Sequence, residues 1–197
     1  MLVCIAGIDG SGKSTLVENL QKALAQKYRC TRLRLYDTVI RSRLQKKAGS
    51  YLRHHKIENK RHNMMVSYLM NEIAEESYPN LMSALKTQDI VIVDRYLETI
   101  DFIVENYQVD KRTLAPIIKE MPSPDVYIYL RVSPAAAYAR ITKVRKPGEG
   151  EELHEITAAA NYYDLHAARL GLKIVDGEKS QEEVFESCMA IINAALS

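Results

Sequence analysis

The stretch from Gly7 to Ser14 carries the residues of this chain whose types and spacing most clearly suggest chemistry. It matches G-x-x-x-x-G-K-S/T at every fixed position, with an apolar run before it and a helical pattern after it. Glycines let the backbone turn tightly enough for several N–H groups to converge on phosphate oxygens, and the N-terminus of the next helix also favours an anion. The stretch therefore predicts a nucleoside triphosphate site, formed by Gly7, Asp9, Gly10, Ser11, Gly12, Lys13, Ser14 and Thr15.

Two residues of this loop have specific tasks in such a site. The ammonium group of Lys13 can bridge the β- and γ-phosphates, and the hydroxyl of Ser14 can ligate Mg²⁺. A glycine-rich turn with a chance lysine is the alternative interpretation, and the flanking strand and helix patterns argue against it. The loop predicts triphosphate binding but leaves open what happens to the γ-phosphate.

A second candidate pair, Asp94 and Arg95, follows the β-branched run at residues 90–93. Such a run is typical of a strand buried on both faces of a parallel sheet. The carboxylate of Asp94 could hold the Mg²⁺ shell directly or through water, whereas its alternative role is a turn residue or helix cap. At the carboxyl end of the strand, Arg95 would lie beside the phosphates and could hold one bidentately; its alternative role is a surface ion pair.

The elements that must position these residues alternate along the chain. Strands are predicted at 2–6, 30–36, 90–93, 126–132 and 172–175. Helices are predicted at 14–27, 38–47, 61–86, 99–104, 113–120, 134–141, 153–170 and after a capping box formed by Ser180 and Glu183. Pro79 is expected to kink or divide the long helix. This alternation predicts an α/β fold with a five-stranded parallel sheet and helices on both faces.

Length and composition set further bounds. The 197 residues, 47% of them hydrophobic and 26% charged, are predicted to form one soluble domain. We expect neither a signal peptide nor a membrane-spanning segment. The three cysteines are odd in number and far apart, so they are predicted to be buried free thiols, and a cytoplasmic setting is expected.

The charge is unevenly spread, although the net charge is only +2. Residues 27–61 contain 12 Lys and Arg but only two acids, whereas the rest of the chain is acidic. A local basic block on an acidic body suggests an anionic ligand at that place.

These motifs together resemble the thymidylate kinase family of nucleoside monophosphate kinases. The resemblance is carried by I-A-G-I-D-G-S-G-K-S-T at the start, V-I-V-D-R-Y at residues 91–96, P-D-V-Y-I-Y-L at residues 124–130 and the basic loop at residues 140–152. It extends over nearly the whole chain. It implies the P-loop kinase fold, with ATP and Mg²⁺ as cofactors and a small-molecule acceptor, expected to be a nucleotide.

The resemblance also implies roles for particular residues. Asp9 resembles the loop carboxylate that approaches the 3′-hydroxyl of the acceptor sugar, and Arg95 resembles the arginine that bridges the acceptor and donor phosphates. The segment at about 140–152 resembles the lid that closes over ATP. Because no basic residue lies between Asp9 and Gly12, the family pattern places the catalytic charge in this lid. The candidates are Arg145, Lys143 and Arg140, with Arg140 also expected to contact ATP.

The departures from the family pattern fall mainly on the acceptor side. After the second strand the family usually has R-E-P-G-G, but this chain has R-L-Y-D-T starting at Arg34. The family's arginine on the long helix is missing from residues 71–76, and the stretch after Tyr96 is not the usual small-residue run. On the fourth strand, Arg131 stands where an acid is common. The predicted acceptor residues are Asp9, Arg34, Arg41, Arg95, Tyr96 and Phe102, with Arg43 as a further candidate.

Three hypotheses follow. The first is ATP- and Mg²⁺-dependent phosphoryl transfer to dTMP or a related pyrimidine nucleotide. The second keeps the kinase scaffold but transfers phosphate to a nucleoside or a non-nucleotide metabolite. The third is a nucleotide switch or nucleic-acid-binding protein, which the missing N-K-x-D motif and the near-zero net charge argue against. The family resemblance also suggests a homodimer.

Overall fold

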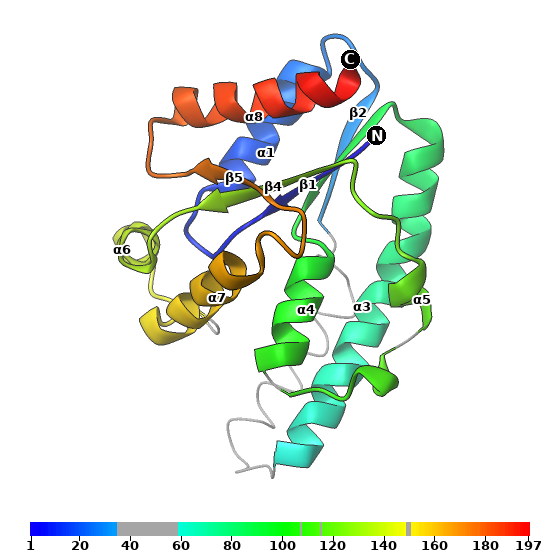
Figure 1. Ribbon diagram of the computed structural model, residues 1–197, viewed down its shortest axis with the longest axis vertical. Coiled ribbons are helices and arrows are strands. Elements are labelled where there is room, and N and C mark those ends of the chain that lie inside the picture. Colours follow the sequence, from blue (N-terminus) through cyan, green and yellow to red (C-terminus); the bar gives the residue numbers. More distant parts are fainter. Residues whose placement is uncertain (35–58, 107, 115, 149–150) are drawn as a thin grey trace.

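The computed structural model describes residues 1–34, 59–106, 108–114, 116–148 and 151–197 (Figure 1). Five strands form its sheet: β1 (Leu2–Ala6), β2 (Cys30–Arg34), β3 (Ile90–Asp94), β4 (Val126–Arg131) and β5 (Lys173–Asp176). The helices are α1 (Lys13–Leu24), α3 (Asn59–Thr87), α4 (Leu97–Asn106), α5 (Pro116–Glu120), α6 (Pro134–Val144), α7 (Leu153–His166) and α8 (Gln181–Leu196), with a 3₁₀ turn at Lys111–Thr113.

The sheet is parallel throughout, in the order β2-β3-β1-β4-β5. Ile5 pairs with both Asp94 and Ile128, so the carboxyl ends of β1, β3 and β4 lie at one edge of the sheet. The loop that follows β1 therefore meets the residues that follow β3 at this edge. This is where an open α/β sheet binds its ligands. The predicted fold class is confirmed.

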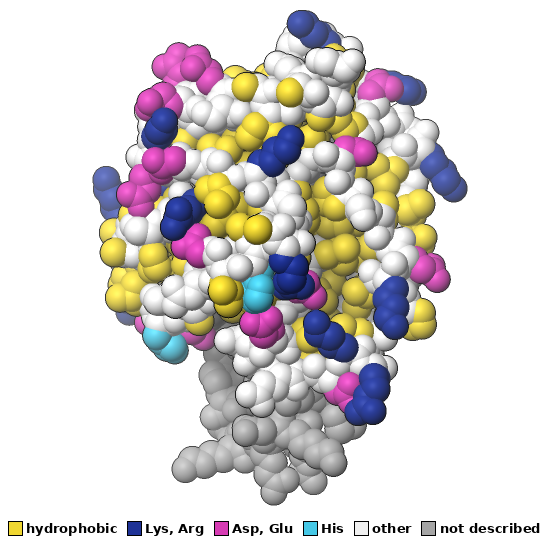
Figure 2. Space-filling model, in the orientation of Figure 1, with side chains coloured by type: hydrophobic (Ala, Val, Ile, Leu, Met, Phe, Trp, Pro, Cys, Tyr) yellow, Lys and Arg dark blue, Asp and Glu magenta, His cyan; other side chains and the backbone are white. Residues whose placement is uncertain are grey.

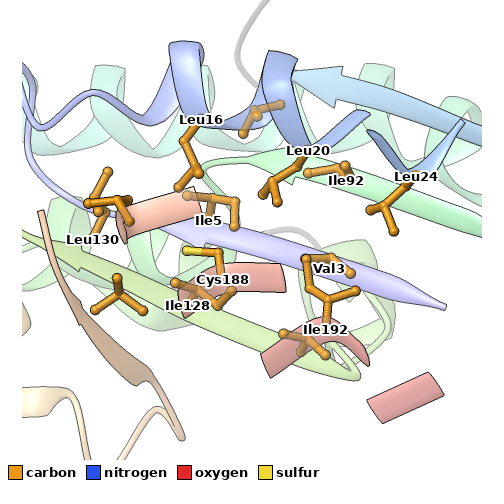
Figure 3. Close-up of a cluster of buried hydrophobic side chains, with 14 of the residues drawn as sticks. Val3, Ile5, Leu16, Leu20, Leu24, Ile92, Ile128, Leu130, Cys188 and Ile192 are labelled. Atoms are coloured by element: carbon orange, nitrogen blue, oxygen red, sulfur yellow. The ribbon is translucent and has the colours of Figure 1, made fainter. Parts of the chain in front are cut away.

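Helices α1 and α8 cover one face of the sheet (Figure 1). Leu16, Leu20 and Leu24 recur at helical spacing along α1 and point toward Val3 and Ile5 of β1 (Figure 3). Cys188 and Ile192 of α8 complete this core, and both are fully buried. This packing fixes α1, and with it the phosphate loop that leads into α1.

The opposite face is covered by α3, α4 and α5, and by α7 next to them. Because β1 is buried on both faces, its alternate residues Leu2 and Cys4 pack against this second layer. Tyr129 of β4 stacks on Tyr163 of α7, with ring centroids 5.2 Å apart. This layer holds α4 and α7 beside the carboxyl edge of the sheet.

Most predicted elements agree with the structure, and the differences have local causes. Pro79 lies inside α3 without dividing it, because residues on both sides of it, Ile73 and Leu81, are buried against the sheet. Helix α7 ends at His166 rather than at Leu170, and Gly171 follows with a positive φ of 67°. The helix predicted at 38–47 lies outside the described residues.

The cysteines are free thiols, as the sequence predicted, and the surface carries both signs of charge. Cys4 and Cys188 are buried and Cys30 is half-buried, and all three are free thiols. On the face shown in Figure 2, basic and acidic side chains are interspersed among apolar ones. Within the described ranges, no helix combines the length and apolarity needed to cross a membrane.

Candidate active site

The glycines of the first loop take conformations that other residues avoid. Gly7, Gly10 and Gly12 have φ values of 146°, 78° and 97°, all in the region that favours glycine. At Gly10 a Cβ atom would also come within 2.4 Å of the carbonyl oxygen of Ala137 in α6. The loop is therefore folded tightly against α6, and among the described residues no side chain caps the N-terminus of α1, which follows Gly12.

Lys13 is almost completely buried at the start of α1. Its Nζ donates to the carbonyl oxygen of Ile8 at 2.7 Å and to Oγ of Ser11 at 3.4 Å, so the side chain curls back over its own loop. Burial, and next the positive charge of Arg95, lower its pKa to about 8. A buried ammonium group inside the loop is well placed to be stabilised by phosphate oxygens.

Ser14 and Asp94 meet across the sheet edge, as the Mg²⁺ hypothesis requires. Ser14 Oγ donates to Asp94 Oδ2 at 3.1 Å. Asp94 is 4% exposed, and within the described residues its buried Oδ1 has no hydrogen-bond partner. A hydroxyl and an unsatisfied carboxylate oxygen are the hard oxygen ligands that suit Mg²⁺. The residues present therefore fit this ion.

Arg34 lies on the metal side of this site in the structure. Its Nη2 donates to Ser14 Oγ at 3.2 Å, and its Nε lies 3.5 Å from Asp94 Oδ2. The sequence predicted Arg34 as an acceptor residue. Its guanidinium could still reach an acceptor phosphate, because half of the side chain is exposed.

Asp9 and Arg95 form a close ion pair between the first loop and the end of β3. Arg95 has a positive φ of 67°, unusual for a residue with a side chain. Burial, the largest single influence, would lower the pKa of Arg95, but the charge and hydrogen bond of Asp9 together with the charges of Tyr163 and Asp94 outweigh it and raise the pKa. The two residues that the family resemblance assigned to the acceptor sugar and the transferred phosphate thus lie together, next to Lys13.

A cavity lies beside the loop, and Arg95 is not among the residues that line it. It is lined by loop and α1 residues, by Arg140 of α6 and by the segment after β5, and its lining includes Gly12, Thr15, Asn19, Arg140, Gly177, Lys179 and Gln181. Arg140 donates to the carbonyl oxygens of Ser11 at 3.4 Å and Gly177 at 3.1 Å. The base and sugar of a nucleotide whose phosphates lie in the loop could fill this cavity. Sequence reasoning had not assigned Lys179 and Gln181 to the site.

The predicted lid segment begins inside α6, which extends to Val144. Arg145 Nη1 and Nη2 each lie 2.5 Å from a carboxylate oxygen of Glu151, and the N–H of Gly148 donates to the same carboxylate at 2.6 Å. The pKa of Glu151 is lowered, chiefly by the hydrogen bond from Arg145. Half of the Arg145 side chain is exposed. Sequence reasoning missed Glu151, whose only signal was an acid at the end of a basic loop.

The remaining predicted acceptor residues lie apart. Tyr96 is fully buried, and its hydroxyl donates to the carbonyl oxygen of Pro122 at 2.8 Å, so its ring belongs to the core. Phe102 is half-buried and lies 5.4 Å from Tyr162, ring centroid to ring centroid, between α4 and α7. Arg41 and Arg43, and most of the basic block, lie outside the described residues.

With this geometry in place, comparison with known proteins identifies the family. The family model "Thymidylate kinase" matches residues 5–188. The chain belongs to the thymidylate kinase family. It is 28% identical over 202 residues to the thymidylate kinase of Leptospira interrogans serogroup Icterohaemorrhagiae serovar copenhageni, covering 97% of this chain and 93% of that protein. It is 27% identical to the probable thymidylate kinase 1 of Saccharolobus solfataricus, covering 99% and 98%.

A solved structure supports the fold. Deoxyadenosine kinase from M. mycoides with bound dATP superposes with a TM-score of 0.65, over 98% of this chain and all of that one. The two sequences are 20% identical, so this likeness concerns the fold alone. Membership of the thymidylate kinase family makes this protein an enzyme of nucleotide phosphoryl transfer.

Proposed function

We propose that this member of the thymidylate kinase family transfers the γ-phosphoryl group of ATP to dTMP or a related pyrimidine nucleoside monophosphate, giving the diphosphate. The observation that carries the proposal is the meeting of two sets of residues at one sheet edge. Lys13, Ser14 and Asp94 form a donor side, and the Asp9–Arg95 pair forms an acceptor side directly next to it.

On the donor side, the loop N–H groups and Lys13 would hold the β- and γ-phosphates. Ser14 and Asp94 would hold Mg²⁺, which when bound neutralises charge on the phosphates. The cavity beside Arg140 would take the base and ribose of ATP. Arg145 is the proposed source of positive charge at the transferred group, with Lys143 and Arg140 as alternatives.

On the acceptor side, Arg95 would bind the acceptor phosphate and align it with the γ-phosphoryl group. Asp9 would exchange its ion pair with Arg95 for a contact to the acceptor sugar hydroxyl. Phosphoryl transfer depends mainly on positioning and on stabilising spread-out negative charge. Two cations, Lys13 and Arg95, flank the place where this charge would develop.

A substrate panel tests the proposal. Purified protein is incubated with ATP, Mg²⁺ and each of the common nucleoside monophosphates, and ADP release and the new diphosphate are measured. Transfer to dTMP or another pyrimidine monophosphate is the expected result. Absence of transfer to any nucleotide would refute it.

A second candidate is a kinase that phosphorylates a nucleoside or another small metabolite. It is favoured by the described part of α3, where residues 71–76 contain three acids and no arginine to hold an acceptor phosphate. Asn71 in this stretch donates to the carbonyl oxygen of Thr113 at 2.8 Å. The same panel extended to nucleosides and non-nucleotide alcohols separates the two candidates by which acceptor releases ADP.

A further inference from the structure

Glu98 in the first turn of α4 is a fully buried carboxylate, with 0% of the residue exposed. Its two oxygens accept from the N–H of Tyr96 at 3.0 and 2.9 Å, from the hydroxyl of Thr99 at 3.0 Å and from the hydroxyl of Tyr127. Burial raises the pKa of this carboxyl, while these hydrogen bonds oppose the rise. A buried carboxylate is costly unless it is hydrogen-bonded, and here each of these three partners donates to it.

Glu98 and Ile5 fix the two backbone N–H groups at the unusual conformation of Arg95. The N–H of Arg95 donates to the carbonyl oxygen of Ile5 at 3.1 Å, and the next N–H, that of Tyr96, donates to Glu98. A residue other than glycine with positive φ is strained and persists only where its surroundings impose that conformation. The Ile5 and Glu98 contacts on either side of Arg95 are such surroundings.

Tyr127 connects this turn to the rest of the sheet. It lies on β4 opposite Cys4 of β1, and its hydroxyl both donates to the Glu98 carboxylate and accepts from the Glu98 N–H at 3.1 Å. The turn that carries Arg95 is thereby tied to β4, which pairs with the strand that leads into the phosphate loop.

A simple helix cap would not need this arrangement. In the capping boxes of α7 and α8, Glu155 and Glu183 also accept from the N–H of the residue before the helix, and both of these hydrogen bonds are exposed. Glu98, in the second helical position of α4, makes the same kind of contact while fully buried, at the cost of desolvation. Its charge also acts on Lys13, whose pKa it raises in opposition to burial and Arg95.

We infer that Glu98 is a positioning residue for Arg95. Its carboxylate holds the Tyr96 N–H, and so keeps Arg95 in the conformation that directs the guanidinium toward Asp9 and the phosphates. The inference rests on the proposed function, because it assigns Glu98 to the alignment of the acceptor phosphate. Because Glu98 is fully buried, it would not itself contact the substrates.

The test is a double-mutant cycle of Glu98→Gln with Arg95→Ala. The glutamine amide has the same shape as the carboxylate but presents an NH₂ group to donors, so Glu98→Gln should release the turn. We expect kcat to fall about 100-fold, as misplacement by about 1 Å can cause, with the KM for ATP nearly unchanged. In the Arg95→Ala background the same change should lower kcat less than about twofold, because residues that act as a unit are not additive.

Two controls separate positioning from folding. Glu105→Gln makes the same chemical change in the same helix, where Glu105 pairs with His166, and should leave turnover unchanged. If Glu98→Gln does not fold, Tyr127→Phe removes one of the donors to Glu98 while keeping the ring, and should lower kcat in the same coupled way. If Glu98→Gln lowered kcat by the same factor in the wild-type protein and in the Arg95→Ala variant, the inference would be overturned.

A readout independent of turnover is the ¹⁵N NMR resonance of the Arg95 Nε–H group, assigned by its loss in Arg95→Ala. In the wild-type protein this resonance should be sharp and its proton protected from exchange with water. In Glu98→Gln or Tyr127→Phe the Arg95 side chain should sample several conformations, so the resonance should broaden and its proton should exchange faster. An unchanged resonance would refute the positioning role. A wild-type protein without kinase activity would instead refute the proposed function and leave this measurement intact.

Discussion

At the residue scale, the buried ammonium group of Lys13 predicts that phosphate binding depends on pH. Its pKa in the folded protein, about 8, is below the ordinary value of 10.5. Its charge therefore costs stability below about pH 8, and this cost is relieved as the pH rises toward 10.5. Because phosphates favour the charged form, ATP binding above about pH 8 should take up a proton.

Calorimetry without Mg²⁺, in buffers of different ionisation enthalpy, measures this uptake. At about pH 9 we expect Lys13 to take up most of one proton per ATP. At about pH 6.5 it should take up close to none, and any proton exchange there comes from the γ-phosphate of ATP. Lys13→Met should abolish the uptake and weaken binding. Uptake that persists in Lys13→Met would assign the titration to another group.

Arg145 offers a second prediction at this scale. If its guanidinium stabilises the transferred group, Arg145→Ala should lower kcat about 100-fold or more, while the KM for ATP changes much less. The Glu151 carboxylate holds Arg145 in place through two contacts. Glu151→Gln should therefore also lower kcat, because Arg145 would then stabilise the transferred group less well. Steady-state kinetics of both variants check this. An unchanged kcat in Arg145→Ala would move the catalytic charge to Lys143 or Arg140.

At the scale of elements, the close contact between the first loop and α6 should decide the shape of the proposed donor site. A methyl group on Gly10 would meet the backbone of Ala137, which no side-chain movement can relieve. We expect Gly10→Ala to displace α6 together with Arg140, to weaken ATP binding at least tenfold and to cost about 2–4 kcal/mol of unfolding free energy.

Gly171→Ala is the matched control for Gly10→Ala. Gly171 also has a positive φ, 67°, but a Cβ there meets nothing within 4 Å. This change should cost only about 1 kcal/mol and leave ATP affinity unchanged. Chemical denaturation measures the unfolding free energy of both variants, and ATP titration measures their affinity. Gly171→Ala shows the effect of backbone strain alone, and Gly10→Ala shows strain together with the clash against Ala137. Equal effects of the two substitutions on ATP binding would contradict the argument.

At the scale of the whole molecule, a ligand that connects the loop, β3 and α6 should stabilise the entire fold. ATP with Mg²⁺ at about 100 times its Kd should add about 2.7 kcal/mol, which raises Tm by about 5–10 °C for a protein of this size. Asp94→Asn should remove the part of the shift that depends on Mg²⁺ and keep the part that ATP gives in EDTA. Thermal unfolding of both proteins with ATP, in Mg²⁺ and in EDTA, measures this. An Mg²⁺ effect that survives in Asp94→Asn would place the ion elsewhere.

The single-domain organisation, the homodimer and the cytoplasmic setting belong to the same scale and stay predictions. Sedimentation of the purified protein would measure the oligomeric state directly.

The sequence by itself determined the strands, the phosphate loop and the family. Buried strands are continuous β-branched runs, and a phosphate loop needs glycine, lysine and serine at set spacing, so both are local patterns. The Asp94-Arg95 pair was likewise visible, because it follows a strand whose carboxyl end must lie at the ligand edge.

Only the tertiary structure decided which side chains meet there. In the folded protein Tyr96 is buried in the core, Arg34 lies beside Asp94, and Arg95 pairs with Asp9. Glu98 accepts a hydrogen bond from the backbone N–H that follows Arg95. The contacts of Arg34 and Arg95 have no sequence period, because they join residues up to 86 positions apart through the packing of separate elements. The contact of Glu98 with the Tyr96 N–H is local, but the burial of Glu98 beside Tyr127 depends on the packing of β4. Local patterns specify where a strand or loop forms, whereas the direction of a side chain at its end depends on the neighbours that the completed fold brings to it.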